Sequence, residues 1–327
     1  MSVINTNTAA NIAASAVKRN ELEMSRAMQR LSTGARINSA KDDAAGLAIS
    51  DRMSAQIGGL NMAVRNANDA ISMIQTIEGA TKEISSMLSR MRELAVQAAS
   101  GTYTATDRTA LDLEFGALMD EISRVAKNTE WNGGKVLIGA TNNNYDANDP
   151  VLTNNIQLGA GASQTMALTF RSWVPTVAYD STQTTAAGAN ADGLDQDDLS
   201  AYSNSGSSAE SAANSSALYW SNGGTATRID ITADTNAAQA ILALDNAING
   251  AAAERARYGA FMSRLQHASD NLANVAVNTA ASRSQIADAD YAAETTELAR
   301  TQIISQASTA MLAQANQVKQ TVLSLLQ

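Results

Sequence analysis

Few side chains of this chain have the types and spacing that catalysis or metal binding requires. The 327 residues include one histidine, His267, and no cysteine. A histidine-based triad, an HExxH zinc site and a thiol nucleophile are therefore excluded. Asp42 and Asp43 are adjacent carboxylates, but such a pair is more typical of a helix start than of an acid–base catalyst. There is no Walker A or GxGxxG loop, so the sequence predicts no enzyme activity and no cofactor.

One acidic cluster loosely matches a calcium-binding loop. Residues 192–198 have the sequence DGLDQDD. Such a loop needs a bidentate glutamate at its twelfth position, and Ser203 stands there instead. We therefore expect a solvated acidic loop rather than a metal site.

The net charge of −9 is concentrated in the middle of the chain. Residues 141–236 contain ten acidic and two basic groups, whereas the flanks contain 22 acidic and 21 basic groups. This balance argues against nucleic-acid binding, which needs a basic face. No apolar run reaches ~18 residues, so no membrane insertion is expected. No cleavable leader is visible, which leaves a cytosolic protein or export in unfolded form through a dedicated channel.

Both ends of the chain have the periodicity of coiled-coil helices. At the N-terminal end Val3, Ala10, Val17, Met24 and Leu31 recur every seven residues. At the C-terminal end, steps of four and three connect Ile304, Ser308, Met311, Ala315, Val318, Val322 and Leu325. Each set lies on one helix face, so the two ends should pair with each other or with neighbouring copies. Because alanine and serine fill many of these positions, we expect the ends to order only on packing against neighbours.

The flanks should form a rod of helices. Helices are predicted over 2–34, 57–100, 106–129 and 241–279, and from a joint near Asp288 and Asp290 to about 325, with a short separate helix beginning near Asp42. The step from Ile74 to Ile77 repeats a step of three, which predicts a slip that locally overwinds the coiled coil. Arg255 interrupts an apolar seam and should face an opposite charge. The predicted fold is mainly α, a long antiparallel coiled-coil rod built from both chain ends.

The middle of the chain has β-structure signals instead. Asn-Gly at 132–133 and at 222–223 predicts two hairpin turns. Apolar residues alternate along short strands at Ile156, Leu158, Met166, Leu168 and Phe170. Residues 180–216 are rich in Ser, Ala, Asn, Asp and Gly, which is typical of a loop. We therefore expect a small β-rich insertion over 177–233.

Several motifs, in the right order at both ends, resemble those of bacterial flagellins. They are LSTGARINSAKDDAAGLAISDRM (31–53), RMRELAVQ (90–97), SRSQIADADYAAE (282–294) and ANQVKQTVLSLLQ (315–327). The similarity covers roughly residues 1–176 and 234–327. It implies a structural subunit that is secreted by the flagellar type III apparatus. Such a subunit polymerises into the extracellular filament used for swimming.

The resemblance also implies three regions and two sets of contact residues. Residues 1–40 with 286–327 would form the filament core, 41–176 with 234–285 a helical rod domain, and 177–233 a variable outer insertion. The expected filament-core packing residues are Val3, Ala10, Val17, Met24, Leu31, Ile304, Met311, Val318, Val322 and Leu325. Arg90, Leu94 and Glu114 would pack against the next subunit, on the face that a flagellin-sensing Toll-like receptor of animals reads.

The implied partners are copies of this chain, a flagellar export chaperone, and the cap and hook–filament junction proteins. One alternative is a junction protein of the same terminal-helix design, which would form only short assemblies. An enzyme-bearing flagellin would need the HExxH motif that is absent here. A cytosolic coiled-coil adaptor would form closed oligomers.

Overall fold

The computed structural model describes residues 8–138, 151–174, 219–222 and 225–324. The predicted loop at 180–216 and the acidic cluster at 192–198 lie outside these residues. The helices are α1 (Thr8–Thr33), α2 (Ala44–Ala98), α3 (Ala105–Asn128), α4 (Asp234–Ala287) and α5 (Tyr291–Ser324). Short hairpins occupy the middle of the chain, so the prediction of a mainly α fold with a small β insertion is confirmed. Two compact units form, residues 1–59 with 274–327 and residues 60–273.

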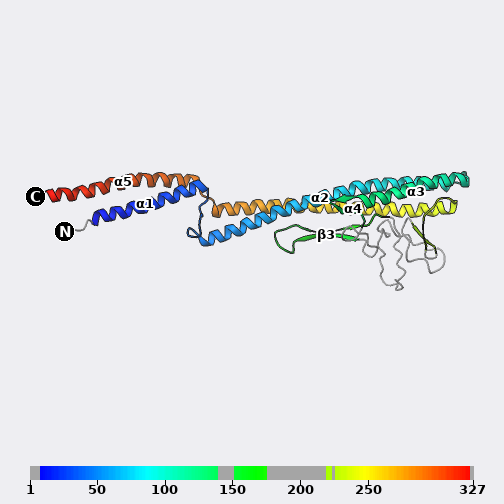
Figure 1. Cartoon of the computed structure of the whole chain (residues 1–327), viewed down its shortest axis with the longest axis horizontal. Coiled ribbons are helices and arrows are strands. Elements are labelled where there is room, and N and C mark those ends of the chain that lie inside the picture. Colours follow the sequence, from blue (N-terminus) through cyan, green and yellow to red (C-terminus); the bar gives the residue numbers. More distant parts are fainter. Residues whose placement is uncertain (1–7, 139–150, 175–218, 223–224, 325–327) are drawn as a thin grey trace, which may run out of the picture. The chain divides into compact units, whose positions relative to one another are not determined.

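In the first unit α1 and α5 pair in antiparallel fashion. Asn20 contacts Thr301, Arg30 contacts Glu294, and Ala35 forms a β-bridge with Asp288, so the α5 number falls as the α1 number rises. Figure 1 shows α1 in blue beside α5 in red, with both chain ends at the same end of the pair. Of the two expected outcomes, pairing of the chain's own ends is the one observed.

The start of α2 differs from the sequence-based expectation. The predicted short helix is wrong, because one helix of 55 residues runs from Ala44 to Ala98. Asp43 caps it, since its Oδ1 accepts from the backbone N–H groups of Ala45 (3.0 Å) and Gly46 (2.9 Å). The helix continues through Gly58 and Gly59, since a glycine weakens a helix by only about 1 kcal/mol.

The seam that α2 presents to the core of the second unit is unbroken. Its positions alternate by three and four over 39 residues, and each is 5% exposed or less. They are Leu60, Ala63, Ala67, Ala70, Ile74, Ile77, Thr81, Ile84, Leu88, Met91, Ala95 and Ala98. The predicted slip at Ile74 is therefore wrong. It arose from following the larger Val64 and Ile71, which are half-buried on the flank, instead of Ala63 and Ala70.

Helices α3 and α4 complete the core of the second unit. Phe115 and Ile122 of α3 and Tyr258 and Leu265 of α4 are among its buried side chains. The first turn of α3 is closed by a capping box, in which Thr104 and Asp107 each accept from the other's backbone N–H.

Charged contacts between α2 and α4 agree with their antiparallel course. An ion pair joins Arg92 to Asp245, and the Arg255 Nη2 lies 4.0 Å from the Glu78 Oε1, as the expected opposite charge. The charged residue that occupies the α4 seam itself is Glu254, which is 1% exposed and pairs with Arg171 and Arg257.

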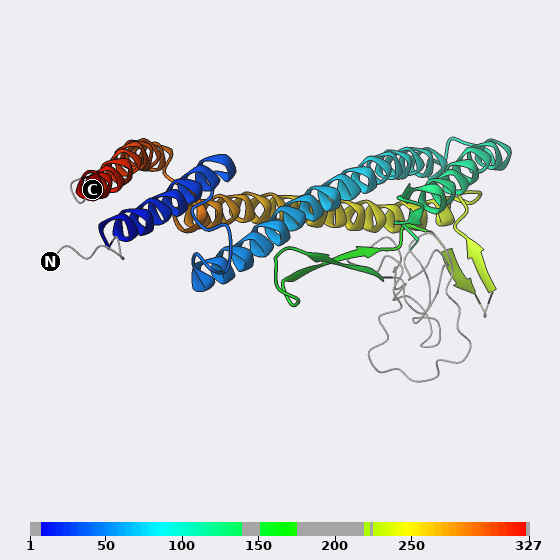
Figure 2. The ribbon, with the colours of Figure 1, turned by 60° about the vertical axis from the view of Figure 1, so that its left-hand side comes forward.

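Three antiparallel hairpins form among the described residues of the middle region. They are β1 (Glu130–Trp131) with β2 (Gly134–Lys135), β3 (Val151–Gln157) with β4 (Thr165–Arg171), and β5 (Tyr219–Asn222) with β6 (Thr225–Arg228). The first turn has positive φ at Asn132 (51°) and Gly133 (76°), as a type I′ turn requires. Figure 2 shows the β3–β4 hairpin beside the helices of its unit. It is fixed there by buried Leu168 and Phe170.

Candidate assembly surfaces

The seam between α1 and α5 is made mainly of small and polar side chains. On α1 its buried or half-buried positions include Ala13, Val17, Asn20, Met24, Ala27 and Leu31. On α5 they include Glu294, Leu298, Thr301, Ser305, Ser308 and Leu312. The predicted N-terminal heptad, as far as it is described, lies on this side, with Ala10, Val17, Met24 and Leu31 all half-buried. The pairing buries little apolar surface, so it contributes little stability by itself.

Large apolar side chains lie on the outer surfaces of the same two helices. They are Ile12, Leu22 and Met28 of α1 and Tyr291, Ile303, Ile304 and Met311 of α5. Ile304 is 38% exposed and Met311 is 69% exposed, so neither predicted packing residue is buried by α1. The exposed side chains are spread over more than one side of each helix, which is typical of helices that are buried among several neighbours. Val3 and Leu325, and the side chains of Val318 and Val322, lie outside the described residues.

The helix pair ends in a joint, here called the elbow, formed by residues 34–43 and 288–290. Its two segments are joined by main-chain hydrogen bonds from the Arg36 N–H to the Ala287 carbonyl (2.7 Å) and from the Ala289 N–H to the Gly34 carbonyl (2.9 Å). Gly34 has a φ of +69°, and its N–H donates to the Arg30 carbonyl, so it closes the end of α1 as a left-handed cap.

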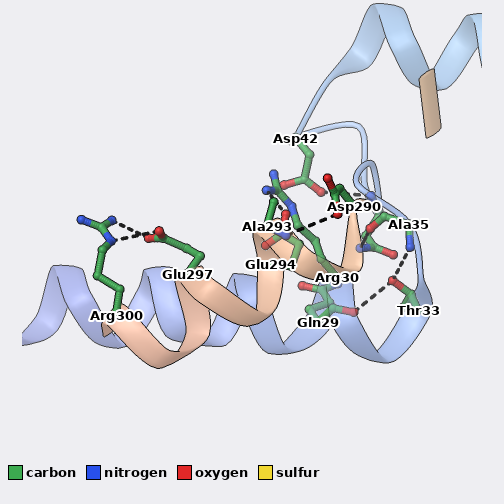
Figure 3. Close-up of polar contacts among 11 residues, drawn as sticks. Gln29, Arg30, Thr33, Ala35, Asp42, Asp290, Ala293, Glu294, Glu297 and Arg300 are labelled. Carbon is green, nitrogen blue, oxygen red and sulfur yellow. Dashed lines mark hydrogen bonds and ion pairs between the residues drawn. The ribbon is translucent and has the colours of Figure 1, made fainter. Parts of the chain in front are cut away.

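Side chains reinforce the elbow. Figure 3 shows Arg30 of α1 reaching Glu294 of α5, with an Nη1–Oε1 distance of 3.0 Å. Asp290 accepts from the Ala292 and Ala293 N–H groups and so begins α5. The Asp42 Oδ2 accepts from the Ser39 hydroxyl and N–H, both at 3.0 Å. The hydrogen bond from the Ser39 hydroxyl lowers the pKa of Asp42, with smaller contributions from the Asn38 and Ser39 amides and from Arg30.

The predicted contact residues of the second unit form an exposed ion-pair cluster. The Arg90 Nη1 lies 3.0 Å from the Glu93 Oε2, and the Nη2 lies 2.9 Å from the Glu114 Oε1. Hydrogen bonds to Glu93 and then to Glu114 raise the pKa of Arg90. Leu94 is 1% exposed and points into the core beneath this cluster. The accessible part of this face is therefore formed by Arg90 and the two glutamates.

Other features do not converge on a reaction centre. Among the described residues, no group of three or more potential metal ligands occurs. His267 is exposed on α4. An open groove of about 310 Å³ lies between α2 and two hairpins, with Asp69, Met73, Trp131 and Ile156 in its lining. No helix within the described residues 8–138, 151–174, 219–222 and 225–324 is both long and apolar enough to cross a membrane.

Weakly packed terminal helices with apolar outer surfaces, joined to a firmly packed helical body, define a class of protein. It is the class of helical structural subunits that assemble through both chain ends. Two family models place the chain within this class. The bacterial flagellin N-terminal helical region matches residues 4–142, and the bacterial flagellin C-terminal helical region matches residues 241–326. The chain belongs to the bacterial flagellin family.

Individual relatives agree. Flagellin D of Vibrio cholerae is 36% identical, over 99% of each chain. A flagellin of Halalkalibacterium halodurans is 40% identical, over 92% of this chain and 91% of that protein. A putative flagellar hook-associated protein from Vibrio parahaemolyticus has a similar fold, with a TM-score of 0.52 over 76% of this chain and all of that one, but only 10% identity. The fold is thus shared with that protein, while the sequence relatives favour a filament subunit over the junction-protein alternative.

Membership of the flagellin family identifies the function of the chain. The chain is a structural subunit, not an enzyme, and it polymerises with copies of itself into the extracellular filament of the bacterial flagellum, which serves motility.

Proposed function

We propose that residues 1–40 with 286–327 form the core of the filament, that 41–176 with 234–285 form a helical rod around it, and that 177–233 form its variable outer surface. The observation that supports this arrangement is the set of exposed apolar side chains on α1 and α5. Burying one such side chain contributes roughly 1.5–3 kcal/mol. A helix pair with a thin inner seam and apolar outer surfaces gains most of its stability from neighbouring subunits.

Within the core the two predicted residue sets have different roles. Ala10, Val17, Met24 and Leu31 pack on the α5 of their own chain. Ile304 and Met311, which α1 leaves exposed, pack on neighbouring chains. We assign Val3, Val318, Val322 and Leu325 to the same core by the continuation of these periodicities.

The test is seeded polymerisation of Met311→Asp followed by electron microscopy. A charge at a contact between subunits should raise the critical concentration at least tenfold, because an unpaired charge would be buried there. The matched control is Gln306→Asp, an exposed polar site on the same helix, which should stay within twofold of wild type. Equal elongation of Met311→Asp and wild type would overturn the assignment, provided that both melt alike by circular dichroism.

We further propose that Arg90 and Glu114 form the surface of the rod that packs on the next subunit, with Leu94 supporting them from beneath. The support is the ordered, half-exposed ion-pair cluster around Arg90. Glu114→Arg should prevent filament growth, because it places two cations side by side. The control is Glu121→Arg, which alters the exposed Glu121–Arg124 pair on the same helix and should leave growth unchanged.

The same cluster is the surface that we propose for a flagellin-sensing Toll-like receptor of animal hosts. Arg90→Ala should reduce receptor activation by the monomer at least tenfold in a cell reporter assay, whereas Arg124→Ala should not. Equal losses from both variants would indicate a general charge effect instead.

The remaining proposed partners act before and during assembly. A flagellar export chaperone would cover the apolar side chains of α5 until export by the type III apparatus, and the cap and junction proteins would contact the terminal helices at the two ends of the filament. The combined variant Ile303→Ser/Met311→Ser should lose chaperone binding in analytical ultracentrifugation. Retained binding would place the chaperone contact elsewhere.

A further inference from the structure

One polar contact is buried in the middle of the terminal helix pair. Asn20 occupies a seam position of α1, is 4% exposed, and donates from its Nδ2 to the main-chain carbonyl of Thr301 at 2.7 Å. Thr301 is fully buried, and its own hydroxyl donates to the Leu298 carbonyl within α5. An asparagine at a seam position is a known means of fixing the alignment of helices, because its buried amide must find a partner.

The Thr301 carbonyl is available to accept from Asn20 because of Ser305, the residue one turn after Thr301 on α5. Helical side chains lean toward the N-terminus and cover the preceding turn. Ser305 stands four residues after Thr301, and its small side chain leaves the Thr301 carbonyl open. One heptad away in either direction, the carbonyls of Glu294 and Ser308 are followed at the same spacing by Leu298 and Leu312. Sliding α1 by a heptad would therefore bring the Asn20 amide to a carbonyl covered by leucine.

Apart from the Arg30–Glu294 ion pair near the elbow, the other seam residues discriminate poorly between alignments. Ala13 and Ala27 face α5, and Ser305 and Ser308 face α1, so small side chains meet small side chains over much of the length. The elbow also aligns the pair, but its main-chain bonds lie at the exposed end, where water can replace them. A buried amide without an acceptor is more unfavourable than an exposed bond exchanged for water.

We propose that Asn20 is a positioning residue that sets the register of α1 against α5, through the one seam carbonyl that Ser305 leaves open. The register decides which apolar side chains of the two helices lie at the same height on the outer surface. Asn20 would thus control the surface that neighbouring copies meet without touching them. This proposal concerns pairing within one chain, so it stands whether or not the pair forms the filament core.

The register can be measured by distances between spin labels. The chain has no cysteine, so Ser25→Cys and Ala307→Cys, two exposed sites on α1 and α5, supply the only labelling positions. Labelled chains are diluted into unlabelled chains of the same variant and polymerised, so that only distances within one chain remain. A heptad slip moves the labels by about 10 Å along the axis, at 1.5 Å per residue.

Asn20→Leu should add a second distance that differs from the parental one by up to about 10 Å, because the separation across the helices is unchanged, and Ser305→Leu should do the same by covering the acceptor carbonyl. Thr301→Val is the matched control, since it removes the hydroxyl but keeps the carbonyl, and it should retain a single distance. A single parental distance in both leucine variants would overturn the proposal and show that the elbow alone sets the register. A shifted distance in Thr301→Val would also overturn it. A variant that does not polymerise alone is measured as a minor component of wild-type filaments, and its distances are interpreted in the same way.

Discussion

The terminal helix pair and the helical body of residues 60–273 differ in how completely they bury their large apolar side chains. In the body, isoleucine, leucine, methionine and aromatic residues lie inside at near-zero exposure, together with alanines, along a seam that continues without interruption. In the terminal pair, Val17, Met24 and Leu31 are only half-buried among alanine, serine, threonine and asparagine, and other large apolar side chains lie outside. Two regions of one chain with the same helical periodicity therefore differ in which contacts bury their apolar side chains, either within the chain or between copies of it. We therefore expect the body to be stable by itself and the terminal pair to depend on neighbouring copies.

Hydrogen exchange on the monomer tests this contrast most strongly. Amides of α2 from 60 to 98 should exchange at least about 10³-fold more slowly than those of α1, because the former open only with the body and the latter open locally. In filaments the difference should largely disappear, as neighbouring chains protect α1. Equal protection of both helices in the monomer would contradict the dependence on neighbours. It would also contradict the sequence-based prediction that the ends order only on assembly.

Truncations at two seam positions sharpen the comparison. Ile77→Ala removes a fully buried side chain of the body and should lower the free energy of unfolding of the monomer by about 2–5 kcal/mol. Val17→Ala, in the half-buried seam of the terminal pair, should change it by less than about 1 kcal/mol. Urea unfolding followed by circular dichroism measures both. A comparable loss at the two sites would show that the terminal seam contributes to the monomer.

The polar contacts of the body should be more sensitive than those on its surface. The Asp112 carboxylate accepts from Arg228 at 2.6 Å and from the Ile231 N–H at 3.1 Å, and so fixes the segment after β6 on α3. Asp112→Ala leaves a buried N–H unpaired and should lower stability by roughly 1–3 kcal/mol. Glu121→Ala, which breaks an exposed ion pair on the same helix, should change it by less than about 0.5 kcal/mol. Similar values for the two would mean that water solvates the Asp112 site.

The smallest expected effect is a loosening of the elbow at low pH. The pKa of Asp42 is lowered in the folded chain, so its charged form is the stabilising one. This contribution is complete above the unfolded pKa of about 3.9 and is lost as the pH falls through the lower folded value. A spin label at Ala40 should become more mobile in that acidic window. Asp42→Asn should remove the pH-dependent step, and Asp51→Asn, on the exposed surface of α2, should keep it. A step that persists in Asp42→Asn would assign it to another group.

Periodicity was enough to predict most helices, and the Asn-Gly pairs predicted both hairpins. Pairing of the chain ends also followed from the periodicity, because Val17, Met24 and Leu31 keep one helical face. The separate short helix near Asp42 was wrong because one helix continues from Ala44 to Ala98. The slip at Ile74 was wrong for another reason, which is that size was taken as a guide to burial. Val64 and Ile71 were preferred to Ala63 and Ala70, although a narrow seam between long helices favours the smaller side chain.

The buried polar residues could not be recognised from the sequence. Asn20, Asp112 and Glu254 look like ordinary surface residues, because their partners lie far away along the chain, at Thr301, Arg228 and Arg171. Leu94 was expected at a contact surface because of its motif, whereas the helical phase of α2 turns it inward. The spacing of Asn20 from Val17 and Met24 was the one signal available, since it fits the heptad seam.

The unbroken seam of α2 has a mechanical consequence for a filament that is turned from one end. From Leu60 to Ala98, a rise of about 57 Å, the alternation of steps of three and four does not break, so no inserted step locally overwinds or unwinds the coiled coil. Torque applied to such a segment is shared along its length, and no turn acts as a torsionally soft point where twist collects.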